Sequence, residues 1–122
     1  GLYRVHQFSK VELFQLVQPE QQQSMEAFEQ ICQLQMQLLK PLGLCLRRLE
    51  MATVELGASA HRKQDIEAWF PRSQRWGELT SASHCLDYQS RRLAIRLAGG
   101  EYPHTLNGTA MAIPRVIMAL LE

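Results

Sequence analysis

The chain has 122 residues, of which 46% are hydrophobic and 20% are charged, and its formal net charge at pH 7 is +1. This length allows one domain with a hydrophobic core, and the composition is that of an ordinary globular protein. The nearly balanced charge gives no electrostatic indication for or against a nucleic-acid partner.

The three cysteines, Cys32, Cys45 and Cys85, form no CxxC pair, and no histidine stands at metal-ligand spacing from them. We therefore expect buried thiols in a reducing compartment. No apolar run approaches the roughly 20 residues that cross a bilayer, so no membrane partner is expected. The chain begins at Gly1 inside a strand pattern and ends at Glu122 inside a helical pattern, which favours a piece of a longer protein.

Residue types alternate over residues 1–14. Successive side chains of a strand point to opposite faces, so this pattern predicts a strand, which residues 15–17 prolong. The odd positions are mostly apolar and suit a core, whereas Arg4, Phe8 and Glu12 share the polar face. That face is either an ordinary solvated surface or a site where a cation, a ring and a carboxylate hold a phosphate, a base and an amine.

From Met25 to Leu39 the apolar residues recur at spacings of three and four, which indicates an amphipathic helix. Ser24 is the expected N-cap, and Pro41 with Gly43 should end the helix. The apolar face is expected to pack on the chain's own sheet, the alternative being a partner-binding face.

Strand patterns dominate the middle of the chain. Residues 44–51 are a short strand candidate, and residues 53–60 form a loop of small residues. Two alternating segments, 65–70 and 76–83, are joined by the turn at residues 71–74 and predict an antiparallel hairpin.

The last third of the chain combines turns, one strand and one helix. In chain order we expect a helical turn running into a strand at 87–97, a turn at 99–100, a strand at 102–106, a bend at 107–108 and a helix at 110–122. Pro114 is tolerated only in the first turn of that helix. Few helices and many strands at hairpin spacing predict an α+β fold, a mainly antiparallel sheet with flanking helices.

The common catalytic signatures GxSxG, GxGxxG, HExxH and the Walker loop are absent from the sequence. The four histidines, His6, His61, His84 and His104, are scattered, and each is expected to be a hydrogen-bonded structural residue. The polar residues that carry chemistry gather instead in three segments: Arg4–Glu12, Asp65–Arg92 and His104–Arg115.

In the third segment, Asn107 and Thr109 are expected at a strand-to-helix corner. Arg115 stands just inside the helix, from where it can reach over the corner toward an anion, helped by the helix dipole. Taken alone, Arg115 is equally well explained by a surface salt bridge.

In order and spacing, the three segments resemble the seryl-tRNA synthetases, enzymes of the second synthetase class. Arg-Val-His-Gln-Phe-x-Lys-Val-Glu resembles the second half of motif 2, and Thr-Leu-Asn-Gly-Thr-Ala-x-Ala-x-x-Arg resembles motif 3. Between them, Asp-Ile-Glu-x-Trp, Glu-x-Thr-Ser-x-Ser and Asp-x-Gln-x-Arg-Arg resemble the ATP-side strands. The resemblance covers residues 1–122 and implies a fragment of the class II catalytic core, from the second half of motif 2 through motif 3.

The resemblance also implies roles on the ATP side. Phe8 resembles the ring that stacks under adenine. Arg4 and Arg115 resemble the two arginines that contact ATP, and they are the expected catalytic groups. Glu78 and Ser81 resemble the pair that holds Mg²⁺ bridged to the ATP phosphates. These residue types fit, because Mg²⁺ prefers hard oxygen ligands that it shares with phosphates.

On the amino-acid side, Glu12 resembles a carboxylate that contacts bound serine, and Asn107 and Thr109 resemble the serine pocket. The implied parent is a homodimer that converts L-serine and ATP to seryl-adenylate and transfers serine to tRNA(Ser). The Glu55-Leu-Gly57 loop and the Arg-Lys-Gln-Asp-Ile-Glu-Ala-Trp run are closer to the mitochondrial branch. This implies the mitochondrial matrix, with the cytoplasm as the alternative.

Motif 1 and the first half of motif 2 have no counterpart in the sequence. The resemblance therefore indicates the function of the parent protein more than an activity of this chain alone. Two alternatives stay open. One is a non-catalytic, synthetase-like paralogue that binds RNA or a partner, and it should have lost Glu12, Glu78 or Arg115, all of which are present. The other is a related ligase for another amino acid.

Overall fold

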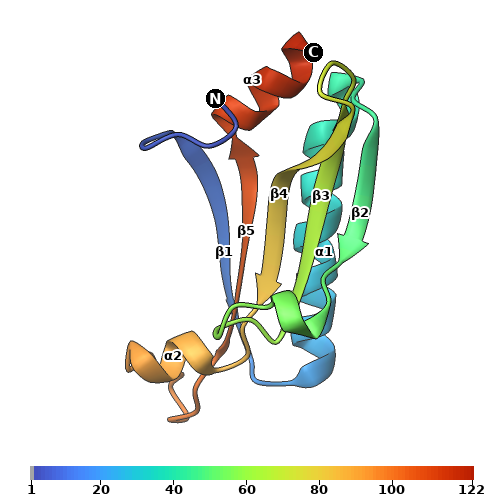
Figure 1. Cartoon of the computed structure of the whole chain (residues 1–122). Coiled ribbons are helices and arrows are strands. Elements are labelled where there is room, and N and C mark those ends of the chain that lie inside the picture. Colours follow the sequence, from blue (N-terminus) through green and yellow to red (C-terminus); the bar gives the residue numbers. More distant parts are fainter. Residues whose placement is uncertain (1) are drawn as a thin grey trace.

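The computed structural model describes residues 2–122, which form a five-stranded antiparallel sheet with three α-helices (Figure 1). The strands are β1 (Lys10–Val17), β2 (Leu46–Glu50), β3 (Arg62–Phe70), β4 (Arg75–His84) and β5 (His104–Ala112). The helices are α1 (Gln21–Leu39), α2 (Tyr88–Arg92) and α3 (Ile113–Leu121), with 3-10 turns at Lys40–Leu42 and Thr53–Glu55. The predicted α+β fold is confirmed.

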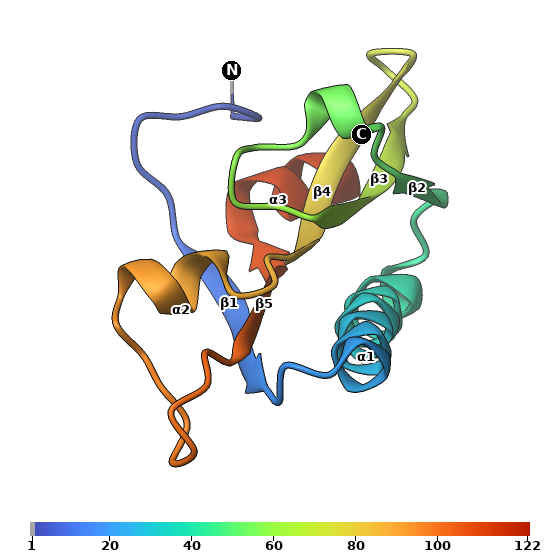
Figure 2. The same cartoon turned by 90° about the horizontal axis from the view of Figure 1, so that it is seen from below.

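The strand order in the sheet is β1-β5-β4-β3-β2, so the first and last strands of the chain pair with each other. The helix α1 covers one face of the sheet, whereas α2 and the connection between β2 and β3 lie toward the opposite face (Figure 2). Side chains on that opposite face are therefore not covered by a long helix.

Two clusters of buried apolar side chains hold α1 against the sheet. The first joins α1 to β4 and β5 and consists of Ala27, Phe28, Ile31, Cys32, Ala82 and Leu106. The second joins the end of α1 to β3, β4 and α3 and consists of Leu39, Ile66, Ala68, Phe70, Leu79, Val116 and Ala119. The apolar face of the helix therefore packs on the chain's own sheet, as predicted.

The elements with strong local signals are confirmed. The β3–β4 hairpin forms with its predicted turn, and β2 lies within the predicted strand segment. The helix α1 ends where Pro41 enters a 3-10 turn and Gly43 adopts a left-handed conformation with φ +71°. Pro114 lies in the first turn of α3, where no backbone N–H is needed.

Two predicted boundaries on the N-terminal side are wrong. The strand begins at Lys10, because its neighbour β5 ends opposite that residue, at Ala112. Residues 2–9 therefore form turns and irregular backbone, and Gly1 lies outside the described residues. Ser24 is not the N-cap: it is buried inside α1, and its hydroxyl donates to the carbonyl of Gln21.

Two predictions on the C-terminal side are also wrong. The strand predicted within residues 87–97 does not form between α2 and β5, because backbone bonds close local turns instead: the N–H of Leu97 donates to the carbonyl of Glu101, and that of Gly100 to the carbonyl of Leu97. The bend predicted at Asn107 and Gly108 is absent, since β5 runs straight through both. A Cβ at Gly108 would lie 2.6 Å from Cγ2 of Ile31, so this glycine allows α1 to approach the sheet.

All three cysteines are free thiols; Cys32 and Cys85 are buried as expected, whereas Cys45 is exposed. Of the helices in residues 2–122, none combines the length and the apolar character that a bilayer span requires.

Three of the four scattered histidines lie close together where β4 ends, at His84, and β5 begins, at His104. The rings of His61 and His104 lie 5.9 and 5.7 Å from that of His84, measured between centroids. His84 is 1% exposed, and neither of its ring nitrogens has a hydrogen-bond partner among the described residues. The prediction of a hydrogen-bonded structural role is therefore wrong for His84. Burial, followed by the neighbouring histidines and Arg62, lowers the pKa of His84 to about 4.

We expect the protein to lose stability as the pH falls from about 6.5 to 4, because the unfolded chain then protonates His84 while the folded chain does not. The free energy of unfolding should fall by about 1.4 kcal/mol per pH unit in this window. Urea denaturation at pH 7 and pH 5 checks this, with His84→Gln flattening the dependence. The matched control is His6→Gln, because His6 is an exposed histidine.

Candidate active site

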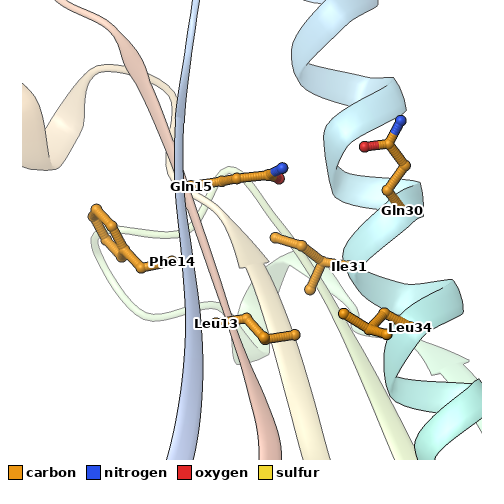
Figure 3. A pocket seen from close by; sticks show the side chains of 6 residues that line it. All are labelled: Leu13, Phe14, Gln15, Gln30, Ile31 and Leu34. Atoms are coloured by element: carbon orange, nitrogen blue, oxygen red, sulfur yellow. The ribbon is translucent and has the colours of Figure 1, made fainter.

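The sheet register places the predicted serine-site residues on the face opposite α1. Glu12 of β1 is paired with Thr109 of β5, and Phe14 is paired with Asn107, so these side chains share one face. Gly108, between Asn107 and Thr109, meets α1 on the other face. Figure 3 shows the same alternation on β1, because Phe14 points away from α1 while its two neighbours point toward it.

A bulge in β4 brings the predicted metal ligands onto this same face. Leu79 is an extra residue relative to β3, and it is buried in the core. Glu78 is paired with Glu67, and Ser81 is paired with Asp65. Because Asp65 and Glu67 are two residues apart on a regular strand, their partners also face the same side. Without the bulge, Glu78 and Ser81 would point to opposite faces.

Two of the predicted serine-site residues, Glu12 and Thr109, are connected across β1 and β5. The hydroxyl of Thr109 donates to Oε2 of Glu12 at 2.9 Å, and Nζ of Lys10 lies 2.8 Å from the same oxygen. Asn107 is apart from this pair, because its amide nitrogen contacts the sulfur of Cys85 at 3.8 Å. The predicted strand-to-helix corner is wrong, since Asn107 and Thr109 both lie in the middle of β5.

Arg115 is held in the first turn of α3 by four contacts. Its Nη1 donates to Oε1 of Glu78 at 2.9 Å and to the carbonyl of the same residue at 3.2 Å. Its guanidinium lies over the ring of Tyr3, 4.6 Å from the centroid, and Nε donates to the Tyr3 carbonyl. Arg115 thus forms the salt bridge considered as an alternative, but with another predicted site residue.

Tyr3 is a site residue that the sequence did not indicate. Its hydroxyl donates to the carbonyl of Glu78 at 3.0 Å, and its ring packs edge-on against Phe70. Tyr3 therefore links the N-terminal segment to β4 and to Arg115. The alternation of residues 1–14 placed it only on the apolar face, because that pattern carries no information about long-range partners.

Arg4 and Phe8 lie in the irregular segment before β1 and not on a strand. Both are exposed, Phe8 to 48%, and within residues 2–122 neither has a side-chain partner. Within residues 2–122, neither side chain forms a hydrogen bond or a salt bridge with Glu12 or Arg115. Arg4 directly follows Tyr3, whose carbonyl accepts a hydrogen bond from Arg115, so the backbone of Arg4 lies near Arg115.

Asp65 is a second residue that the sequence analysis did not single out. It is 5% exposed, it is paired with Ser81, and Nζ of Lys63 lies 3.1 Å from its Oδ1. Burial raises the pKa of the Asp65 carboxyl; the hydrogen bond from Lys63 lowers it, and the charge of Glu78 raises it. The acid-apolar alternation of this strand could have indicated it, since that pattern puts Asp65 and Glu67 on one face.

The donor set near Glu78 suits a particular kind of metal site. Within the described residues, no three His, Cys, Asp or Glu side chains converge as a metal cage. Glu78 and Ser81 offer a carboxylate and a hydroxyl on one face, and Mg²⁺ takes such oxygens together with substrate phosphates and waters. The residues fit a magnesium ion that arrives with a phosphate substrate.

Residues 1–122 match the family described as "tRNA synthetase class II core domain (G, H, P, S and T)". The chain belongs to this class II synthetase family. This synthetase chain is 53% identical over 126 aligned positions to the mitochondrial serine–tRNA ligase of Bos taurus, covering 100% of the chain and 24% of the ligase. It is 47% identical to the serine–tRNA ligase of Treponema pallidum, covering 100% of the chain and 30% of that ligase.

A solved structure gives the same result. The seryl-tRNA synthetase from Pyrococcus horikoshii complexed with ATP superposes with a TM-score of 0.93 at 42% identity, over 100% of the chain and 28% of that structure. The family resemblance and the class II core fold predicted from the sequence are therefore confirmed. The synthetase chain spans less than a third of each of these three proteins.

Proposed function

We propose that the protein carrying this chain is a serine–tRNA ligase, which activates L-serine with ATP and transfers serine to tRNA(Ser). The observation that supports it most is that one open sheet face carries both the Thr109–Glu12 pair and the oxygen donors of Glu78 and Ser81. The full-length similarity of the chain to proteins named serine–tRNA ligase points to the same reaction.

The serine side follows from the hydrogen bonds present. The one hydroxyl proton of Thr109 is donated to Glu12, so its oxygen is left to accept a hydrogen bond from the ammonium or the hydroxyl of serine. The carboxylate of Glu12 accepts further donors from the same substrate. In this proposal, Asn107 forms the wall of the pocket rather than a corner.

On the ATP side, Phe8 stacks on adenine, and Arg4 and Arg115 bind the phosphates. Arg115 exchanges a bond to Glu78 for a phosphate oxygen. Glu78 and Ser81 would hold Mg²⁺, which would neutralise charge on the phosphates. The serine carboxylate is already ionised, so it attacks the α-phosphorus without a general base. A bond forms between a carboxylate oxygen and the α-phosphorus, and the bond from that phosphorus to the bridging oxygen breaks, so pyrophosphate leaves with the bonding electrons.

We further propose that residues 1–122 are part of the catalytic domain, from the second half of motif 2 through motif 3, and that the whole protein is a homodimer. For localisation we propose the mitochondrial matrix. The support is the higher identity to the Bos taurus mitochondrial ligase, 53%, than to the bacterial ligase of Treponema pallidum, 47%.

The test is serine-dependent exchange of pyrophosphate into ATP by the purified whole protein. Exchange that requires serine supports the proposal. A synthetase-like paralogue that only binds RNA or a partner would give no exchange with any amino acid. A ligase of another specificity would exchange faster with alanine, threonine, glycine or cysteine than with serine.

Removing the ring of Phe8 should weaken ATP binding by about 1–3 kcal/mol, the range for stacking between a base and an aromatic side chain. Phe8 is half-exposed and has no partner among the described residues, so its loss should leave the fold intact. ATP titration of Phe8→Ala and Phe8→Tyr in the whole protein measures this, with Tyr expected to retain affinity. Unchanged affinity in Phe8→Ala would remove Phe8 from the adenine site.

A further inference from the structure

The strands β4 and β5 pair only over a short part of their length. Their ladder consists of Ala82 with Gly108, Ser83 with Asn107, and His84 with Leu106. Beyond these pairs the two strands diverge toward α3 (Figure 1). The carbonyls of Ser81 and Thr109 stand where the ladder opens, so they need partners other than the opposite strand.

The side-chain amide of Gln35, in α1, fills this opening. Its Nε2 lies 2.8 Å from the carbonyl oxygen of Ser81 and 2.9 Å from that of Thr109. Nε2 also lies 2.8 Å from the hydroxyl oxygen of Thr80, so its two N–H groups are shared among three acceptors, and the Thr80 hydroxyl in turn donates to the Thr109 carbonyl. Gln35 and Thr80 are each 1% exposed, so no solvent replaces these bonds.

The close approach of Gln35 depends on Gly108. A Cβ at that position would lie 2.9 Å from Nε2 of Gln35, so the amide reaches the sheet only because the residue is glycine. Gln35, Gly108 and the short β4–β5 ladder thus form one arrangement on the α1 face of the sheet.

The two residues that Gln35 connects carry different parts of the proposed site on the opposite face. The side chain of Ser81 belongs to the proposed metal pair with Glu78, and the hydroxyl of Thr109 donates to Glu12 in the proposed serine pocket. We propose that Gln35 is a positioning residue. By binding the backbone carbonyls of Ser81 and Thr109 on the α1 face, it fixes the distance between the proposed metal pair and the proposed serine pocket on the opposite face. This inference rests on the proposed function.

If Gln35 positions the two strands, replacing it should lower the reaction rate although its side chain does not touch a substrate. Replacing Gln35 with Met keeps the length of the side chain but removes both N–H donors. The Ser81 carbonyl then loses its side-chain donor, and the Thr109 carbonyl keeps only the Thr80 hydroxyl, so the link between the two strands is lost and they shift. Misalignment of the two reactants by about 1 Å can cost on the order of 10²-fold in rate.

The test compares Gln35→Met and Gln35→Glu with the matched control Gln37→Met in the whole protein, because Gln37 is an exposed glutamine on the same helix. Serine-dependent pyrophosphate exchange gives kcat and KM, and thermal unfolding gives stability. We expect kcat to fall by on the order of 10²-fold in Gln35→Met, measured well below its unfolding midpoint, and not in the control.

Gln35→Glu keeps the inference testable even if Gln35→Met does not fold. The ionised carboxylate of this variant would face the carbonyls of Ser81 and Thr109 and could donate to neither. Once protonated, the carboxylic acid could donate one hydrogen bond to one of them. The rate of this variant relative to wild type should therefore rise as the pH is lowered from 8 to 6. Variants that unfold earlier but exchange like Gln37→Met, with no pH-dependent recovery, would overturn the role of Gln35 and leave the proposed reaction standing. Absence of serine-dependent exchange in the wild-type protein would overturn the proposed function itself.

Discussion

Glu78→Gln should abolish serine-dependent pyrophosphate exchange while leaving the fold intact. In the proposed site the carboxylate of Glu78 holds Mg²⁺ on the ATP phosphates, and a neutral amide cannot replace that charge. A metal contributes several kcal/mol to stabilising the transition state, so the expected loss is on the order of 10³-fold or more.

The fold should persist because the amide oxygen of Gln can still accept the bond from Arg115. Arg115 also donates to the main-chain carbonyls of Glu78 and Tyr3, which the substitution does not remove. The unfolding midpoint of the variant should therefore stay close to that of the wild type.

The matched control is Glu67→Gln. Glu67 is directly opposite Glu78 on the same face, but its own partner is Arg47, at 2.6 Å. Exchange is measured for both variants at rising Mg²⁺ concentration. Near-normal exchange in Glu78→Gln, or an equal loss in Glu67→Gln, would take Glu78 out of the metal site.

Local patterns in the sequence predicted the elements whose periodicity is set by the core. The helix α1 and the β3–β4 hairpin each have an apolar period that their burial explains. The end of α1 was also predictable, because Pro41 and Gly43 act through their own backbone. These signals need no knowledge of distant partners.

The errors occur where a distant contact decides the local conformation. Asn-Gly is a strong turn signal, but Gly108 lies in a strand because α1 needs the space of its missing side chain. Residues 2–9 alternate like a strand yet have no strand opposite them, because β5 ends at Ala112. Sequence alone contains neither fact.

For the candidate site, too, the sequence predicted some features and not others. Its residue types and their spacing indicated the family that the comparisons confirmed. Their geometry was not readable, because the bulge at Leu79 and the placement of Arg115 over Tyr3 depend on packing between segments far apart in the chain. Gln35 was overlooked, since a single polar residue on an amphipathic helix gives no signal of its own.

Thr109→Val should reduce the preference for serine over alanine. A site built to hydrogen-bond a substrate hydroxyl can reject the analogue without it by about 10⁴–10⁵, because its own polar groups stay unpaired. Valine keeps the shape of threonine and removes the hydroxyl that donates to Glu12. The loss should therefore appear mainly as a lower kcat/KM for serine, by about tenfold or more, since one such hydrogen bond contributes about 1–3 kcal/mol.

The scaffold should tolerate this change, because the bond that connects Thr109 to Gln35 uses the backbone carbonyl. Thr105→Val is the matched control: Thr105 lies on the same strand and face, but its hydroxyl donates to Gln89 and not to Glu12. The control variant should lose some stability and keep the serine-over-alanine ratio of the wild type.

Pyrophosphate exchange with serine, alanine, threonine, glycine and cysteine separates the possible errors. Threonine should be rejected by the volume of its extra methyl group, so its rate should respond less to Thr109→Val than that of serine. If another amino acid is activated better than serine by the wild-type protein, the proposed substrate is wrong. If serine is preferred but Thr109→Val leaves the ratio unchanged, the reaction stands and the hydroxyl-binding group lies elsewhere on this face, because the Thr109–Glu12 pair would then serve only to connect β5 to β1.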